Sequence, residues 1–165
     1  MGFMIRPSLD EFKQKAKQGN LIPVYREILA DMETPVSAFL KIDDGRYSFL
    51  LESVEGGEKW ARYSFLGSRP EVVVRSFGRT VEVIRHGKKE TRDFEHDPLE
   101  AVRDILAEYR PVPDPALPRF YGGGVGFMGY DVVRFFERLP DRKKPGLDTP
   151  DVLFMITDTL VIFDT

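Results

Sequence analysis

Residues 72–87 read VVVRSFGRTVEVIRHG, and they decide the fold class of this 165-residue chain. Two runs rich in β-branched residues, Val72–Phe77 and Val81–Arg85, flank the turn dipeptide Gly78-Arg79, and His86-Gly87 closes the second run. Runs of this kind, joined by a short glycine turn, are typical of antiparallel strands. The stretch therefore predicts an antiparallel hairpin or meander near the centre of the chain.

Further strand candidates lie on both sides of this hairpin. They share a high content of aliphatic and aromatic residues and are bounded by glycine or polar turn residues. Upstream are Tyr47–Ser53 (YSFLLES) and the short run Arg62–Leu66, and downstream is Val152–Phe163 (VLFMITDTLVIF), which we expect to form one β-type run.

Four segments carry helix signals. Ser8 and Glu11 form a capping box, so a helix should run from there to about Gln18 and bury Leu9, Phe12 and Ala16. The other predicted helices begin at Thr34-Pro35, at Asp97-Pro98 with Asp97 as the cap, and at Asp131, the last running to about Leu139. Together these elements predict an α+β fold, a mostly antiparallel β-sheet with helices packed on its outer face.

Composition narrows the class of protein. The chain has 24 basic and 27 acidic side chains, a formal net charge of −3, which argues against a nucleic-acid-binding or membrane-surface module. The absence of cysteine excludes disulfides, cysteine nucleophiles and thiolate metal sites. No apolar run approaches the roughly 20 residues of a membrane span, and the N-terminus becomes charged too early for a signal peptide. We therefore expect a soluble, cytoplasmic protein.

One motif matches the sequence pattern of a cofactor-binding site. Residues 124–129 read GVGFMG and match the G-x-G-x-x-G pattern of dinucleotide-binding loops. That pattern needs a buried strand directly before it and a helix opening on its third glycine, whereas a proline-rich segment precedes it here. We expect these glycines to let strands pack closely or bulge instead. The sequence shows no convincing catalytic apparatus. The two histidines, His86 and His96, each lack a second ligand at metal spacing, and the carboxylates are scattered.

One pair of segments does indicate a binding site. The strand candidate at Leu50 ends abruptly in Glu52 and Ser53, and after a glycine loop the chain returns through Arg62, Tyr63 and Ser64. A carboxylate and a hydroxyl opposite an arginine and an aromatic ring suit a zwitterionic amino acid with an apolar side chain. The alternative is an exposed strand end with a surface salt bridge between Glu52 and Arg62.

Three segments together carry a resemblance to a known family. They are TPVSAFLKI (34–42), LLESVEGGEKWARYSFLG (50–67) and GGGVGFMGYDVVRFFERLP (122–140). In this order they resemble the N-terminal region of anthranilate synthase component I, a member of the chorismate-utilising enzyme family, from about Ser8 to Thr165. The LLES string followed by RYSFLG points to the anthranilate branch of that family.

The resemblance implies a part of a larger enzyme. Members of this family are lyases of tryptophan biosynthesis: they bind chorismate with Mg²⁺, add ammonia from a glutamine amidotransferase partner, component II, and release anthranilate and pyruvate. Their Mg²⁺ ligands and chorismate-binding groups belong to the C-terminal half, so no catalytic or metal-binding residue carries over to this chain. Residues 1–165 would be a truncated N-terminal domain of a larger β-sandwich, inactive without its own C-terminal half.

By the same resemblance this region contributes regulation. The family's N-terminal half supplies much of the site for the allosteric feedback inhibitor L-tryptophan. The corresponding residues here are Leu51, Glu52, Ser53, Arg62, Tyr63 and Ser64, with looser matches at Pro23 and Lys59. Two rival interpretations stay open: the N-terminal domain of aminodeoxychorismate synthase component I, of the folate pathway, and a free-standing amino-acid-binding module.

Overall fold

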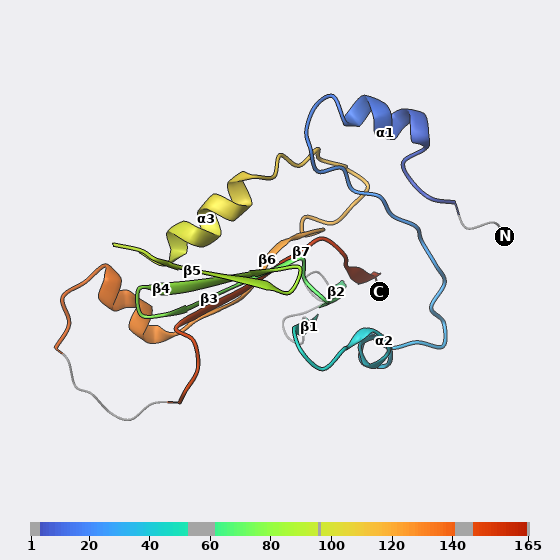
Figure 1. Ribbon diagram of the computed structural model, residues 1–165. Coiled ribbons are helices and arrows are strands. Elements are labelled where there is room, and N and C mark those ends of the chain that lie inside the picture. The colour runs from blue at the N-terminus through green and yellow to red at the C-terminus, as the bar shows by residue number, and fades with distance from the viewer. Residues whose placement is uncertain (1–3, 53–61, 96, 141–146, 165) are drawn as a thin grey trace.

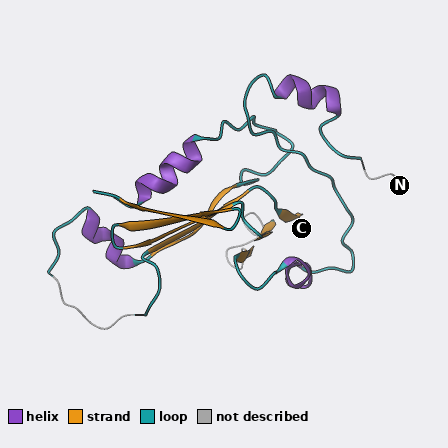
Figure 2. Ribbon diagram, in the orientation of Figure 1, coloured by secondary structure: helices purple, strands orange, loops and turns teal. Residues whose placement is uncertain are grey.

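The fold is α+β, as predicted, with two antiparallel sheets and few helices. The computed structural model describes residues 4–52, 62–95, 97–140 and 147–164, so the predicted site residues Ser53 and Lys59 lie outside the described residues. Figures 1 and 2 show the arrangement. In chain order the elements are α1 (Leu9–Lys15), α2 (Pro35–Ile42), β1 (Ser48–Glu52), β2 (Tyr63–Ser68), β3 (Val72–Phe77), β4 (Thr80–Arg85), β5 (Lys88–Asp93), α3 (Leu99–Ala107), β6 (Gly123–Met128), the 3-10 helix η1 (Tyr130–Phe135), β7 (Val152–Thr157) and β8 (Val161–Asp164).

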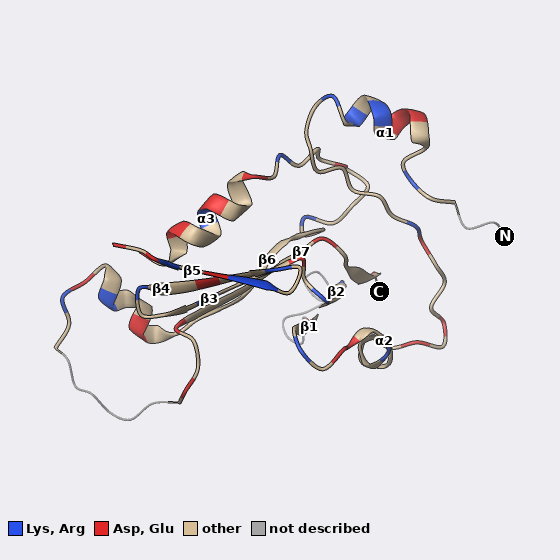
Figure 3. Cartoon of the chain, viewed as in Figure 1, with Lys and Arg blue, Asp and Glu red and all other residues tan. Residues whose placement is uncertain are grey.

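The larger sheet has five strands in the order β5-β4-β3-β7-β6. The predicted hairpin is confirmed: β3 pairs antiparallel with β4, and Val74 lies opposite Val83. The sequence analysis missed β5, KKETRD, because all six residues are exposed and show no apolar alternation. This strand is specified by its backbone pairing with β4, and its charges of both signs (Figure 3) protect the edge of the sheet against further pairing.

The hydrophobic core lies between this sheet and α3, which runs along one of its faces in Figure 1. Alternate residues of β3 share a face with those opposite them on β4 and β7, so their side chains form one apolar layer. The Asp97 carboxylate accepts a hydrogen bond from the Leu99 amide at 2.8 Å, but the N-cap of α3 is Pro98 rather than Asp97. The buried cluster consists of Val72, Val74, Val81, Ala101, Val102, Ile105 and Ile156.

The smaller sheet has three strands in the order β1-β2-β8, and α2 packs against β1 and β2. The expectation that Val152–Phe163 forms one run was wrong. Its first half is β7, inside the five-stranded sheet, and its second half is β8, at the edge of the three-stranded sheet. The chain turns between them, where the Thr157 hydroxyl donates to the Thr159 carbonyl at 3.1 Å. Composition alone does not predict that the two halves join different sheets, because both are rich in apolar residues.

The sequence predicted where helices begin more accurately than which helix residues are buried. The capping box of α1 is confirmed, since the Ser8 amide donates to the Glu11 carboxylate at 2.8 Å and the Glu11 amide to the Ser8 hydroxyl at 3.4 Å. However, α1 ends at Lys15, and none of its residues is buried; Leu9 is 68% exposed. Capping is a local interaction, whereas burial needs a facing surface.

The helix predicted from Asp131 to Leu139 is instead the shorter 3-10 helix η1, in which only Val132 is buried. A segment with so little apolar contact has no packed face to extend it into an α-helix. In the part of the chain that the structure describes, every helix is too short or too polar to cross a bilayer.

Candidate amino-acid-binding site

The two segments that the sequence singled out are neighbouring strands. β1 and β2 pair antiparallel, with Leu51 opposite Phe65 and Glu52 opposite Ser64. Because side chains alternate between the faces of a sheet, Glu52 and Ser64 share one face, whereas Leu51 and Tyr63 share the other. The pairing thus brings the two segments together but divides the predicted residues between two surfaces.

Arg62 forms an ion pair with Asp164, a carboxylate that was not among the residues predicted for the site. Its guanidinium donates to both oxygens of Asp164, with Nε bonded to Oδ1 and a terminal nitrogen 2.7 Å from Oδ2. This geometry arises because β2 also pairs with β8, where Tyr63 lies opposite Asp164. The alternative interpretation paired Arg62 with Glu52; the structure pairs it with a residue 102 positions away. No local pattern could have indicated this partner.

An aromatic wall lies beside this ion pair. The Arg62 guanidinium is 5.0 Å from the centroid of the Tyr63 ring. The rings of Tyr63 and Phe65 are 6.0 Å apart, and Phe65 meets Phe120 edge-on at 5.3 Å. Next to Phe65 across the strands, Leu51 is 45% exposed. The sheet therefore presents accessible apolar side chains beside a cation and an anion.

This combination can bind an amino acid. The Arg62 guanidinium can donate hydrogen bonds to a ligand carboxylate, and Asp164 can accept them from a ligand ammonium group. An apolar ligand side chain can pack on Leu51 and the aromatic rings. Sequence reasoning missed Asp164 and Phe120, which come from distant parts of the chain.

Pro23 is half-buried and lies on the long segment between α1 and α2. The backbone bonds of its neighbours run to Arg6 and to the segment after α3 rather than to β1 or β2. The Asn20 and Leu21 amides donate to the Arg110 carbonyl at 3.1 and 3.3 Å, and the Val112 amide donates to the Leu21 carbonyl at 2.9 Å. The structure does not show Pro23 joined to the strands that carry the other candidate residues.

The Arg62–Asp164 pair predicts a pH dependence. Hydrogen bonding from Arg62 lowers the pKa of the Asp164 carboxyl below its ordinary 3.8. A carboxyl whose pKa is lower in the folded state stabilises the protein above its unfolded pKa, and this contribution disappears as the pH falls through the folded value. Both side chains are more than half exposed, so we expect a small effect.

Asp164→Asn should therefore lower the unfolding temperature by a small, constant amount from neutral pH down to about 3.8, and the difference should vanish below that. Thermal unfolding followed by circular dichroism across this range measures it. Asp10→Asn, which changes a carboxylate of α1 whose side chain is 97% exposed, is the control. A difference that grows on acidification would contradict the assigned pair.

The glycine motif allows close packing within the five-stranded sheet. Residues 123–128 form β6, an edge strand, and a 3-10 helix follows rather than an α-helix. A Cβ on Gly126 would overlap the backbone carbonyl of Leu153 on β7, so the close approach of two backbones requires glycine there. The expectation that these glycines allow close strand packing is confirmed at Gly126.

His86 has an ordinary environment, and His96 lies outside the described residues. His86 is a turn residue with φ 49°, its side chain is 75% exposed, and its Nε2 atom lies 4.0 Å from the Glu71 carboxylate. Across residues 4–52, 62–95, 97–140 and 147–164, no three His, Cys, Asp or Glu side chains gather closely enough to hold a metal ion.

The chain is similar in sequence to several curated proteins. No protein-family model matches the chain. Anthranilate synthase component 1 of Acetivibrio thermocellus is 44% identical over 161 residues, covering 98% of this chain and 32% of the relative. The protein of the same name from Synechocystis is 46% identical over 164 residues, and that from Aquifex aeolicus is 41% identical over 159. The crystal structure of anthranilate synthase component I from Streptococcus pneumoniae covers 85% of this chain at 25% identity, with a TM-score of 0.47.

The chain spans about a third of the length of the curated relatives that it matches. Over nearly its whole length the chain is similar in sequence to one component of a synthase. The particular protein that it resembles over nearly its whole length is anthranilate synthase component I, so the resemblance predicted from three motifs is confirmed.

Proposed function

We propose that residues 1–165 are the N-terminal part of an anthranilate synthase component I and act as its scaffold and regulatory region. The whole enzyme would convert chorismate and ammonia, supplied by a glutamine amidotransferase component II, into anthranilate and pyruvate. By the family resemblance, the Mg²⁺ required by such an enzyme would bind in its C-terminal half. Similarity to the curated relatives over 98% of the chain supports this assignment.

The surface of the chain also supports a place in a larger protein. Its accessible surface is 12,617 Å², whereas a self-contained globular protein of this mass exposes about 8,000 Å². Large apolar side chains on several elements stay open, among them Leu40 of α2 at 71% and Met128 of β6 at 55%. Further protein packed on these elements would remove this apolar surface from water.

We further propose that the β1–β2–β8 sheet contributes much of an inhibitor site for L-tryptophan. The observation that carries this proposal is the Arg62–Asp164 pair beside Tyr63, Phe65 and Leu51. The pair offers one charge for each end of the zwitterion, and the apolar side chains offer a surface for the indole ring. Glu52 and Ser64 lie on the opposite face, at the end of the strands that leads to Ser53.

Arg62→Met should weaken tryptophan binding by the 165-residue chain at least tenfold. Methionine keeps much of the apolar stem of arginine but cannot bond a carboxylate. A charge-assisted hydrogen bond contributes about 1.5–3 kcal/mol, and about 1.4 kcal/mol is a factor of ten. Isothermal titration calorimetry with L-tryptophan measures the change. Arg92→Met, which removes an equally exposed arginine on β5, should leave binding unchanged. Equal affinity for the Arg62 variant and the wild type would remove Arg62 from the site.

A further inference from the structure

A hollow lies where the two sheets meet. Its walls come from four connections: α2 to β1, β2 to β3, β4 to β5, and β7 to β8. The connections after β2 and after β7 each carry the chain from one sheet to the other. Its volume is about 410 Å³, within the range of small-molecule sites. We call this hollow, lined by residues of these four connections, the junction pocket.

The floor of the junction pocket is apolar and its rim is charged. Val73 of β3, which is 3% exposed, and Ile84 of β4 lie opposite each other across the sheet and form the floor. Two arginines, one histidine and three carboxylates surround them, so the rim offers polar groups of both kinds to a ligand. These residues are Arg46, Arg69 and His86, and Asp44, Glu71 and Asp158.

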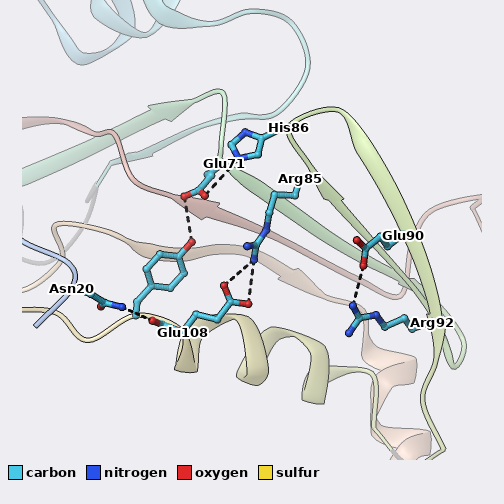
Figure 4. Close-up of polar contacts among 8 residues, drawn as sticks. Asn20, Glu71, Arg85, His86, Glu90, Arg92 and Glu108 are labelled. Atoms are coloured by element: carbon cyan, nitrogen blue, oxygen red, sulfur yellow. Dashed lines mark hydrogen bonds and ion pairs between the residues drawn. The ribbon is translucent and has the colours of Figure 1, made fainter.

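Four of these six groups already have protein partners. Arg69 lies 3.6 Å from the Asp44 carboxylate. Glu71 accepts the Tyr109 hydroxyl at 3.3 Å and faces His86, in the polar network that Figure 4 shows next to the Arg85–Glu108 pair. Burial, together with the Glu71 carboxylate, raises the pKa of the Tyr109 hydroxyl and keeps it a donor. This network fixes one side of the pocket.

The other two charges are left for a ligand. Among the described residues the Arg46 guanidinium has neither a hydrogen bond nor an ion pair, although its own backbone amide donates to Asp44 at 3.2 Å. Asp158 accepts only the neighbouring Thr159 hydroxyl, at 3.2 Å, within the same part of the structure. Arg46 comes from the α2–β1 connection and Asp158 from the β7–β8 connection, so they reach the pocket from separate segments.

The backbone beside the pocket is strained. Arg69 has a φ of 54°, although it is neither a glycine nor in a hairpin turn and precedes Pro70. This left-handed conformation is costly for a side-chain-bearing residue. The Arg69 amide donates to the Tyr47 carbonyl at 3.2 Å, which ties the α2–β1 connection to the β2–β3 connection. Strain of this kind collects at binding sites, where the surrounding structure holds it.

We propose that the junction pocket binds a small zwitterion, an L-amino acid with an aliphatic side chain. Arg46 donates to its carboxylate, Asp158 accepts from its ammonium group, and its side chain packs on Val73 and Ile84. The proposal follows from a cation and an anion that have no ion pair among the described residues, and from an apolar floor in a pocket large enough to hold such a ligand. It does not rest on the proposed inhibitor site, whose side chains belong to β1, β2 and β8.

The ligand chemistry can be tested with three probes on the isotopically labelled 165-residue chain. L-Leucine carries both charges, L-leucinamide lacks the carboxylate, and N-acetyl-L-leucine lacks the ammonium group. We expect L-leucine to shift the amide resonances of residues 46–47, 69, 71 and 86–87 in a saturable way, and each analogue to bind at least tenfold more weakly. No saturable shift up to the solubility of L-leucine, or equal binding of all three probes, would overturn the proposal.

Single variants locate the site. Arg46→Met and Asp158→Asn change exposed side chains, so the fold should survive, and each should weaken leucine binding at least tenfold. Arg92→Met, which changes an exposed arginine of β5 outside both proposed sites, should leave leucine binding unchanged. Normal leucine binding in the Arg46 and Asp158 variants, with loss of binding in the Arg62→Met variant, would assign leucine to the proposed inhibitor site and overturn this inference.

Discussion

Gly126→Ala should remove β6 from the five-stranded sheet and destabilise the chain by at least about 3 kcal/mol, the upper end of the usual range for one substitution. The added Cβ would overlap the Leu153 carbonyl oxygen and lie 2.8 Å from the Leu153 carbonyl carbon and from the Phe154 Cα atom. All three are backbone atoms of β7, so no side-chain rotation can make room. The strands would have to separate, and β6 would lose its pairing with β7.

Urea unfolding followed by circular dichroism measures this loss, with Gly124→Ala as the matched control. Gly124 lies on the same strand, but its added Cβ would meet only side-chain atoms of Phe154 and Ile156, at 3.4 and 3.5 Å. These are ordinary van der Waals distances, so we expect a change within about 1 kcal/mol. Equal unfolding midpoints for the two variants would show that β7 does not approach Gly126 as closely as the structure has it.

Gly19→Ala should release the N-terminal segment from the body of the protein. The new Cβ would overlap the Arg110 carbonyl oxygen and lie 2.9 Å from Cγ2 of Val112, which is itself 4% exposed. The Arg110 carbonyl is the acceptor for both the Asn20 and the Leu21 amide, so displacing it breaks two bonds at once. We expect the Leu21 and Val112 amides to exchange with solvent at least tenfold faster, while the β3–β4 amides keep their protection.

Two further variants test the same contacts, one with a smaller expected effect and one with none. Asn20→Ala removes the side-chain bonds to the Glu108 carbonyl at 2.8 Å and from the Arg110 amide at 2.6 Å, so it should accelerate exchange by a smaller factor. Lys17→Ala changes an exposed side chain bonded only to Gln14 in the described structure and should have no effect. Unaltered exchange in both Gly19→Ala and Asn20→Ala would show that these contacts do not hold the segment.

Short sequence patterns predicted the elements that are stabilised by contacts between residues close together in the chain. The capping box at Ser8, the N-cap at Thr34 and the hairpin at Gly78 each depend on residues within a few positions, and all three are present. The same signals did not predict where the elements pack. The α1 helix forms but buries nothing, and the apolar run from Val152 divides between two sheets.

The candidate site shows the same division. The motif residues at Leu51–Glu52 and Arg62–Ser64 were expected to face each other, and β1 and β2 do pair. Their register then separates Glu52 and Ser64 from Leu51 and Tyr63, because a sheet places alternate side chains on opposite faces. The order of residues in a motif does not reveal which of them share a surface.

The sequence by itself determined the α+β class, the starts of α1 and α2, the central hairpin and the family that the chain resembles, because each depends on short-range pattern or on similarity. Only the tertiary structure decided that Arg62 is paired with Asp164, that the charged segment Lys88–Asp93 is a strand, and that Arg46 and Asp158 line one pocket. These contacts join residues far apart in the chain. Their geometry follows from strand order and register, which are set by the packing of the whole sheet.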